Sequence, residues 1–230
     1  MIPTDSHAHD EDLLTHADAA TLEAPDELGH TAATGHHYLH VCSGPDREGS
    51  YARELAALGA RCEDVDIIQD ASKDLTCQTY WTKLAGDTER GTYTGIQEGP
   101  VCTTFSAARG LAGGPPRLRG LHRDLFGLPG ISQEQRQQVN RDTIIADRCA
   151  HLALVMHGLG RPWIIEQPKY RPGLPHMFLL PSYRRLRRLP GVKCTTFVQC
   201  HLGAKSEKGT TVLYFGLVLP RSVFRPRCTH

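Results

Sequence analysis

The sequence predicts an α/β protein with a mostly parallel sheet and an antiparallel hairpin at its C-terminal end. Between residues 36 and 165, short apolar runs alternate with amphipathic segments, and strands that alternate with helices favour parallel pairing. A glycine-containing loop follows the first of these runs, as in parallel sheets that bind ligands at their strand ends. Near the C-terminus, two β segments at 194–199 and 210–219 are joined by the link 203–209, which suits a hairpin.

The composition indicates one domain with a tail at each end. The chain has 230 residues and a formal net charge of +1, so it is long enough for one large core, and its total charge does not indicate a nucleic-acid partner. Residues 1–35 are acidic and lack Lys and Arg, so we expect a disordered tail there. We assign the domain to residues 36–220 and a short basic tail to 221–230.

Cysteine and histidine usage indicates a chain without a metal site. The 8 cysteines include no Cys-x-x-Cys pair, which argues against a zinc ribbon and favours a reducing compartment over a disulfide scaffold. The histidines of the first forty or so residues have no carboxylate or cysteine at ligand spacing, so we interpret them as scattered and solvent-exposed. No apolar run has the length of a membrane-spanning helix, and the N-terminus lacks the order of a secretory signal. We therefore expect an intracellular protein, in the nucleus or cytoplasm, without membrane attachment.

The first predicted unit is a strand, a loop and a helix. The strand covers 38–42, and the helix covers 51–58 and ends at Gly59. The loop between them contains Gly44 and Gly49, which would let backbone N–H groups and the positive helix end approach a ligand. Such loops are common in parallel-sheet proteins, so this one is only weakly specific.

An acidic residue is predicted at the tip of the second strand. Residues 61–68 form that strand, and Asp66 is our choice for the tip, with Glu63 and Asp64 as alternatives. In a Rossmann fold that binds a nucleoside, an acid about 20 residues after the glycine loop binds the ribose hydroxyls. A solvated acid at a strand end is the alternative interpretation.

A cysteine follows the third strand at the tip of a tight loop. A helix is predicted around 81–84 and a strand at 93–97, and a Gly-Pro turn then leads to Cys102, with Phe105 as an apolar anchor. A cysteine presented in this way can act as a nucleophile if its thiolate is stabilised. The alternative is a small residue packed under a turn, because free cysteines are usually buried and inert.

A long loop and a long helix come next. Residues 107–131 are rich in Gly, Pro and Arg, and we interpret them as a lid or a substrate-contacting segment. The helix is predicted at 133–156, and a buried strand at 162–165 then leads to Glu166. That carboxylate is either a solvated strand end or a catalytic group at the ligand-binding edge. The apolar face of the helix consists of Val139, Ile145, Cys149, Leu152 and Met156.

Five short segments, in this order, resemble one family of enzymes. They are Cys-Ser-Gly-Pro at 42–45, Gly-Pro-Val-Cys-Thr-Thr-Phe-Ser at 99–106, Gly-Pro-Pro-Arg-Leu-Arg at 114–119, Glu-Gln-Pro at 166–168 and Gln-Cys-His-Leu-Gly at 199–203. Together they resemble the cytosine-5 DNA methyltransferases, and most closely a divergent methyltransferase-like domain of mobile elements and of protist and fungal genomes. The resemblance extends over roughly residues 38–219, and the cysteine loop is its most specific part.

The resemblance implies a Rossmann-like fold that binds S-adenosylmethionine and methylates carbon 5 of cytosine in DNA. It implies that Cys102 adds to carbon 6 of the base and that Glu166 holds the ring-nitrogen and amino edge. The implied contacts to S-adenosylmethionine come from Ser43, Gly44, Gly49, Asp66, Asp74, Leu75 and Pro100. The implied contacts to nucleic acid come from Ser106, Arg109, Arg117 and Arg119.

Several departures from the family pattern leave two other functions open. Val101 stands where the family has a second proline, Gln167 stands where it has asparagine, and residues 199–203 lack the arginines of the late Gln-x-Arg-x-Arg pattern. No segment after the hairpin has the length of a target-recognition region. One alternative is a methyltransferase for another position, such as the adenine amino group, although such enzymes carry a Pro-Pro-aromatic loop without the cysteine. The other is a non-catalytic domain that binds nucleic acid through its Arg-rich segments, including 184–188.

Overall fold

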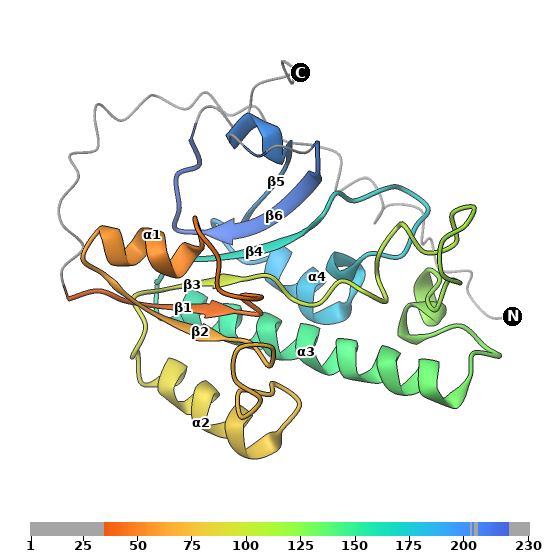
Figure 1. Cartoon of the computed structure of the whole chain (residues 1–230), viewed down its shortest axis with the longest axis horizontal. Coiled ribbons are helices and arrows are strands. Elements are labelled where there is room, and N and C mark those ends of the chain that lie inside the picture. Colours follow the sequence, from red (N-terminus) through yellow and green to blue (C-terminus); the bar gives the residue numbers. More distant parts are fainter. Residues whose placement is uncertain (1–34, 203, 205–206, 221–230) are drawn as a thin grey trace, which may run out of the picture. The chain divides into compact units, whose positions relative to one another are not determined.

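The computed structural model describes residues 35–202, 204 and 207–220 (Figure 1). This part of the chain is an α/β structure with a 6-stranded mixed sheet in the order β2-β1-β3-β4-β6-β5. The predicted basic tail and all of the predicted acidic tail except Gly35 lie outside the described residues. Among the helices of the described part, none is long and apolar enough to cross a membrane.

The elements follow the predicted order, with one helix added before the hairpin. The strands are β1 (His37–Val41), β2 (Arg61–Val65), β3 (Gly95–Glu98), β4 (Trp163–Pro168), β5 (Lys193–Val198) and β6 (Gly209–Phe215). The α-helices are α1 (Tyr51–Ala57), α2 (Gln78–Glu89), α3 (Gln133–Gly158) and α4 (Pro181–Arg187). Within the described residues, short 3₁₀ helices accompany them: η2 (His122–Phe126), η3 (Met177–Leu179) and η4 (Gln199–Leu202).

The sheet is parallel except for β6. Strand β1 pairs in parallel with both β2 and β3, and β3 pairs in parallel with β4. Strand β6 pairs antiparallel with β4 on one side and β5 on the other, which confirms the predicted hairpin at the sheet edge. From β1 the chain passes to β2 on one side and later to β3 on the other. The carboxyl end of β1 is therefore a topological switch point, where α/β sheets bind their ligands.

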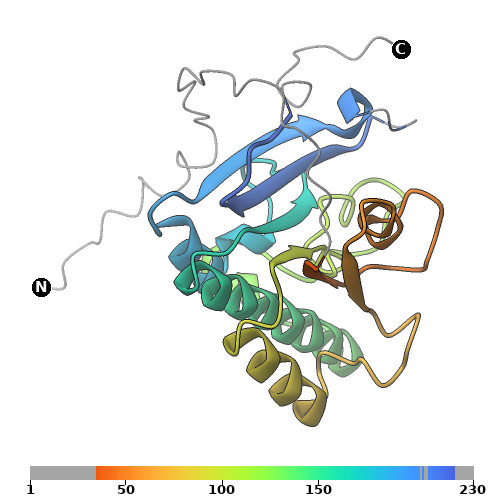
Figure 2. The ribbon, with the colours of Figure 1, turned by 90° about the vertical axis from the view of Figure 1, so that its left-hand side faces the viewer.

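Helices cover both faces of the sheet. Figure 2 shows α2, α3 and α4 together on one face and α1 on the other. Helix α3 begins with a capping box, in which Ser132 Oγ accepts from Gln135 N at 3.2 Å and Gln135 Oε1 accepts from Ser132 N at 2.9 Å. The face predicted for this helix is confirmed, because all its members are buried: Val139, Ile145, Cys149, Leu152 and Met156. Each fully buried side chain of this kind contributes about 1.5–3 kcal/mol.

Three local expectations differ from the structure. The Arg-rich run 184–188 overlaps helix α4, which begins at Pro181 and was not predicted. The helix buries Tyr183 and Leu186, and the arginines around them made this apolar spacing hard to recognise in the sequence. His40 is buried on β1, where its Nδ1 lies 3.0 Å from Asp64 Oδ1, and is not a solvent-exposed histidine. The predicted lid is partly packed into the core, with three buried residues: Leu118, Arg119 and Leu125.

Candidate functional site at the carboxyl ends of the strands

The predicted site residues follow strands that run in one direction. In register, Val41 on β1 lies opposite Val65 on β2 and Glu98 on β3, and Glu98 lies opposite Ile165 on β4. The loops after these strands therefore leave from one edge of the sheet. They carry Cys102 and the residues predicted to bind a cofactor, whereas Glu166 lies on β4 itself, one residue after Ile165.

The loop after β1 is tied to the acid after β2. Asp66 accepts from the backbone N–H of Gly44 at 2.9 Å and from that of Ile68 at 2.8 Å. The Gly44 amide, which we expected to face a ligand, is thus used within the protein. Gly44 and Gly49 have φ of +71° and +69°, and a Cβ on either would meet nothing within 4 Å. The loop therefore leaves open space beside a partly exposed carboxylate that keeps lone pairs for further hydrogen bonds.

The alternative acids on β2 have other partners. Glu63 accepts from the hydroxyl of Tyr93 at 2.9 Å, and Asp64 faces His40. Both belong to the strand itself, whereas Asp66 follows its last residue. Asp66 is therefore the acid at the strand tip.

Asp74 and Leu75 form the entrance to α2. Asp74 Oδ1 accepts from Thr76 N at 2.7 Å and from Thr76 Oγ1 at 2.8 Å, which closes a turn of the kind that Asp favours. Leu75 is buried, and its carbonyl oxygen accepts from Arg148 on α3. The two residues thus have a local structural role, and Asp74 stays partly exposed.

Hydrogen bonds to neighbouring strands hold the Cys102 loop at its start. The amide of Gly99 donates to Val41 O at 2.9 Å, and Gln167 Nε2 donates to Pro100 O at 2.9 Å. Within the loop, the amide of Phe105 donates to Cys102 O at 2.9 Å. Phe105 is buried, as predicted. The cysteine loop is therefore anchored to β1 and β4 as well as to its own strand.

A buried polar chain supports the far side of the same loop. Thr104 donates to Asp142 Oδ2 through its hydroxyl at 2.8 Å, and the same hydroxyl accepts from Arg119 Nε at 2.9 Å. Arg119 also donates to Leu125 O at 2.7 Å, and its guanidinium lies 3.7 Å from the centre of the Phe105 ring. Arg119 is fully buried, and burial lowers its pKa to about 10. Arg119 therefore supports the loop from inside, and its predicted phosphate contact is wrong because solvent does not reach the side chain.

The other predicted nucleic-acid contacts differ in their accessibility. Arg109 donates to Thr103 O at 2.7 Å and to Pro116 O at 3.0 Å, so it braces the loop that carries it. Ser106 Oγ accepts from Ala108 N at 3.2 Å. Arg117 is exposed, which leaves its side chain accessible to a partner.

The β5–β6 hairpin supplies the hydrogen-bond donors that reach Glu166. Glu166 Oε1 accepts from Lys208 Nζ at 3.0 Å and from Gln199 Nε2 at 3.3 Å. Sequence reasoning placed Gln199 in a motif without a role and missed Lys208. The signal was weak, because residues far apart in the chain meet here only through the pairing of β6 with β4.

Cys102 and Glu166 interact electrostatically. Burial raises the pKa of the Cys102 thiol, the Lys208 ammonium lowers it, and the carboxylates of Glu166 and Asp142 raise it. The net direction is upward, so the resting side chain is a thiol at neutral pH. The geometric counterpart of these opposing effects is the ion pair between Glu166 Oε1 and Lys208 Nζ at 3.0 Å.

Two further features concern the remaining cysteines and the possible ligands of a metal ion. The free cysteines of the described part include Cys42, Cys62, Cys77, Cys149 and Cys194 as well as Cys102. Cys200 is disulfide-bonded, which the predicted reducing compartment did not lead us to expect. The residues that the structure describes contain no cluster of three or more His, Cys, Asp or Glu that could hold a metal ion.

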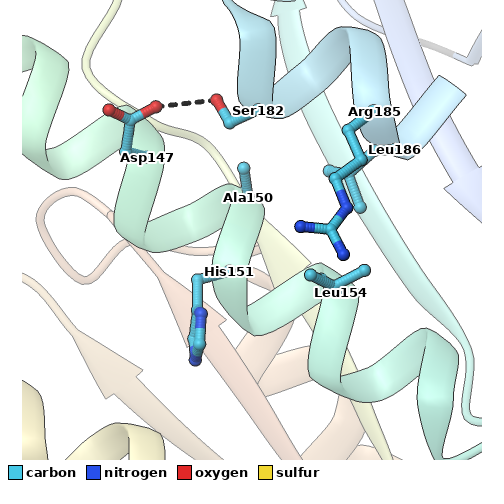
Figure 3. Close-up of a pocket in the computed structure, with 7 residues that line it drawn as sticks. All are labelled: Asp147, Ala150, His151, Leu154, Ser182, Arg185 and Leu186. Carbon is cyan, nitrogen blue, oxygen red and sulfur yellow. Dashed lines mark hydrogen bonds between the residues drawn. The ribbon is translucent and has the colours of Figure 1, made fainter.

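A cavity of about 200 Å³ lies elsewhere, between α3 and α4. Figure 3 shows Asp147 in a hydrogen bond with Ser182 at one end of the cavity and the Arg185 side chain reaching toward Leu154. No residue predicted to bind a cofactor or to perform catalysis lines this cavity, although Arg185 and Leu186 belong to the Arg-rich segment 184–188. The chemistry suggested by the sequence therefore belongs to the strand ends.

No protein-family model matches the sequence, and no curated protein matches it either. The resemblance carried by the short motifs therefore stays a prediction.

Proposed function

We propose that this chain is an S-adenosylmethionine-dependent methyltransferase that acts on carbon 5 of cytosine in DNA. One observation supports this most strongly: the Cys102 loop and the end of β4 are joined. Gln167, next to Glu166, donates to Pro100 O two residues before Cys102, and the Glu166 charge acts on the thiol. A thiol and a carboxyl on one ligand-binding edge suit nucleophilic activation of a pyrimidine.

The sheet topology is compatible with the fold of such enzymes. The sheet is mostly parallel, and its C-terminal hairpin inserts β6 as the reversed strand between β4 and β5. A mostly parallel sheet with a C-terminal hairpin was expected from the sequence, whereas the order of β4, β6 and β5 was not predicted. Fold alone does not establish an activity, so the proposal depends on the site residues.

The loops around the switch point fit an adenosine-containing cofactor. The open space beside Gly44 and Gly49 could admit it, and Asp66 could accept from its ribose hydroxyls. Asp74 and Ser43, which are partly exposed, would contact the cofactor directly, whereas Leu75 and Pro100 are buried and would only shape the walls of the site. When bound, S-adenosylmethionine supplies an electrophilic methyl group.

Cys102 and Glu166 would activate the base together. The Cys102 thiol loses its proton to solvent, and the thiolate forms a bond to carbon 6, which moves the electron pair of the ring double bond toward carbon 5. Glu166 accepts from the exocyclic amino group and holds the ring as charge develops. After carbon 5 has been methylated, its proton passes to solvent, and cleavage of the bond between carbon 6 and sulfur restores the ring double bond and the thiolate.

The base must leave a DNA duplex to reach these groups. Extrusion of a nucleotide costs a few kcal/mol, which phosphate contacts can offset. Exposed Arg117 is suited to such a contact, whereas buried Arg119 is not.

Calorimetric titration with S-adenosylmethionine is the first test, followed by transfer of a labelled methyl group to DNA. We expect binding of the cofactor and methylation of cytosine. We also expect a covalent complex with DNA that carries 5-fluorocytosine, because this base has no proton on carbon 5 to lose and the bond to sulfur therefore persists. Cys102→Ser should abolish methylation and the covalent complex. Cys77→Ser, which removes an exposed free thiol, should retain both. Equal adduct formation by wild type and Cys102→Ser would disprove the role of Cys102.

One observation favours a second candidate, a non-catalytic nucleic-acid-binding domain. Burial raises the pKa of Cys102 and keeps it a thiol, which a binding domain tolerates and a nucleophile must overcome. Such a domain would release no heat with S-adenosylmethionine and would still bind DNA, with an affinity that falls as salt rises. The same titration therefore separates the two candidates.

A further inference from the structure

The two arms of the β5–β6 hairpin converge on one oxygen atom. Gln199 follows the last residue of β5 and Lys208 precedes the first residue of β6, and the amide of Gln199 donates to Lys208 O at 3.0 Å. Across the β4–β6 pair, Glu166 lies opposite Val212. The hairpin end thus lies beside the Glu166 carboxylate, and both of its donors reach Oε1.

We propose that Lys208 is a positioning residue that bridges Glu166 and Cys102, so that the β5–β6 hairpin assembles the reactive pair. In the residues that the structure describes, both hydrogen bonds to the Glu166 side chain end on Oε1. This leaves Oε2 to meet the amino edge of the base. The Lys208 ammonium balances the negative charge of the Glu166 carboxylate at 3.0 Å. The inference deepens the proposed function and depends on it for its catalytic meaning.

The exposure of the pair favours an electrostatic role over a stabilising one. The side chains of Lys208 and Glu166 are 50% and 32% exposed, and ion pairs with such access to water contribute little to folding. A cation held at 3.0 Å from Glu166 nevertheless acts on the thiol, since Lys208 lowers the pKa of Cys102 while Glu166 raises it. Without Lys208, the carboxylate would oppose formation of the thiolate that the reaction needs.

Lys208 also supplies a positive charge near a stretch of the sequence that lacks arginine. The stretch 199–203 lacks the arginines found at this point in the family that the chain resembles. The cation comes instead from the opposite arm of the hairpin, nine residues after Gln199. The pairing register makes this exchange possible, because it joins the two ends of the hairpin.

The test measures the Cys102 thiol directly and does not require methyl transfer. In the full chain, the rate of alkylation by iodoacetamide is followed across pH on the peptide that contains Cys102. For Lys208→Met we expect the midpoint of this profile to move to higher pH and the rate near pH 8 to fall about three- to tenfold, because a nearby cation is lost. Lys208→Arg should keep the wild-type profile. Lys83→Met removes a lysine at the same 3.0 Å distance from a carboxylate, that of Asp87, and is the matched control.

A second variant separates the charge from simple packing. Glu166→Gln should move the profile to lower pH, and Glu166→Gln combined with Lys208→Met should return it toward wild type. An unchanged profile in Lys208→Met would overturn the inference, even if the enzyme methylates DNA. A shifted profile in a chain that methylates nothing would support the electrostatic bridge and count against the proposed function. If methylation occurs, Lys208→Met should lower kcat more than it raises KM for DNA.

Discussion

The side-chain amide of Gln167 donates a 2.9 Å hydrogen bond to the carbonyl oxygen of Pro100. This bond joins the carboxyl end of β4 to the loop that carries Cys102, and Gln167 is only 2% exposed. The sequence suggested that glutamine at this position departs from a family pattern with asparagine. The structure shows that the side chain reaches the Cys102 loop. The glutamine that differs from the family pattern therefore connects the end of β4 directly to the Cys102 loop.

Gln167→Leu should loosen the Cys102 loop. The substitution leaves Pro100 O without its donor in a buried place, so we expect a loss of about 1–3 kcal/mol in the free energy of unfolding. Urea unfolding measures this loss. The exposed Gln137→Leu on α3 is the control and should change stability by no more than about 0.5 kcal/mol. A Gln167→Leu protein as stable as wild type would show that the bond contributes nothing.

Thr104→Val should disrupt the polar chain beneath the same loop. The hydroxyl of Thr104 both donates to Asp142 and accepts from Arg119, two buried charged side chains. Valine has nearly the same shape but makes neither bond, so we expect a loss of about 2–4 kcal/mol. Thermal and urea unfolding check this result, with the exposed Thr79→Val as the control. A loss of unfolding free energy below about 0.5 kcal/mol would show that these hydrogen bonds of Thr104 contribute little to stability.

Glu98 should make the protein less stable as pH rises. It is fully buried at the end of β3, and in the described part of the chain neither of its carboxyl oxygens has a hydrogen-bond partner. Burial, followed by the nearby Cys42, raises the pKa of Glu98 well above 4.5. The folded protein therefore binds more protons than the unfolded chain above about pH 4.5, and stability falls there by at most about 1.4 kcal/mol per pH unit.

Glu98→Gln removes this titration. Unfolding free energies of the two proteins, measured from pH 4 to pH 8, should diverge in favour of the variant as pH rises. A constant difference over that range would show that Glu98 does not titrate as its burial implies. The exposed Glu134→Gln on α3 provides the control.

His176 should make the protein sensitive to acid. Its Nε2 lies 2.8 Å from Pro168 O, and its Nδ1 accepts from the amide of Phe178 at 3.1 Å, so the folded ring is neutral with its proton on Nε2. Burial lowers the pKa of His176 from 6.5 to about 4. The unfolded chain therefore binds the extra proton, and about 3 kcal/mol of stability is lost as pH falls from 6.5 to 4.

His176→Gln keeps a donor for Pro168 O but cannot titrate. We expect a variant that is less stable at pH 7 and whose stability changes less between pH 6.5 and pH 4 than that of wild type. The exposed His151→Gln should retain the wild-type pH dependence. Equal pH dependence in wild type and His176→Gln would disprove this source of acid sensitivity.

Local patterns predicted most of the elements because each depends on neighbouring residues. Short stretches of sequence are enough to recognise the apolar spacing of α3, the glycine loop after β1 and the two segments of the hairpin. Helix α4 was not predicted, because its two buried residues, Tyr183 and Leu186, lie next to or within the run 184–188, which contains four arginines. Arg119 was misread for a related reason: its type suggests a surface cation, and only the surrounding carbonyl groups and the Phe105 ring explain its burial.

The sequence alone determined the order of the six strands and of helices α1, α2 and α3, and the presence of a cysteine and a glutamate near two strand ends. The tertiary structure decided which side chains complete the site. Lys208 meets Glu166 only through the β4–β6 pairing, and Asp142 meets Thr104 only because α3 packs under the sheet. Such contacts join residues far apart in the chain, and strand register and helix packing set them. For that reason the spacing of residues along the sequence does not reveal them.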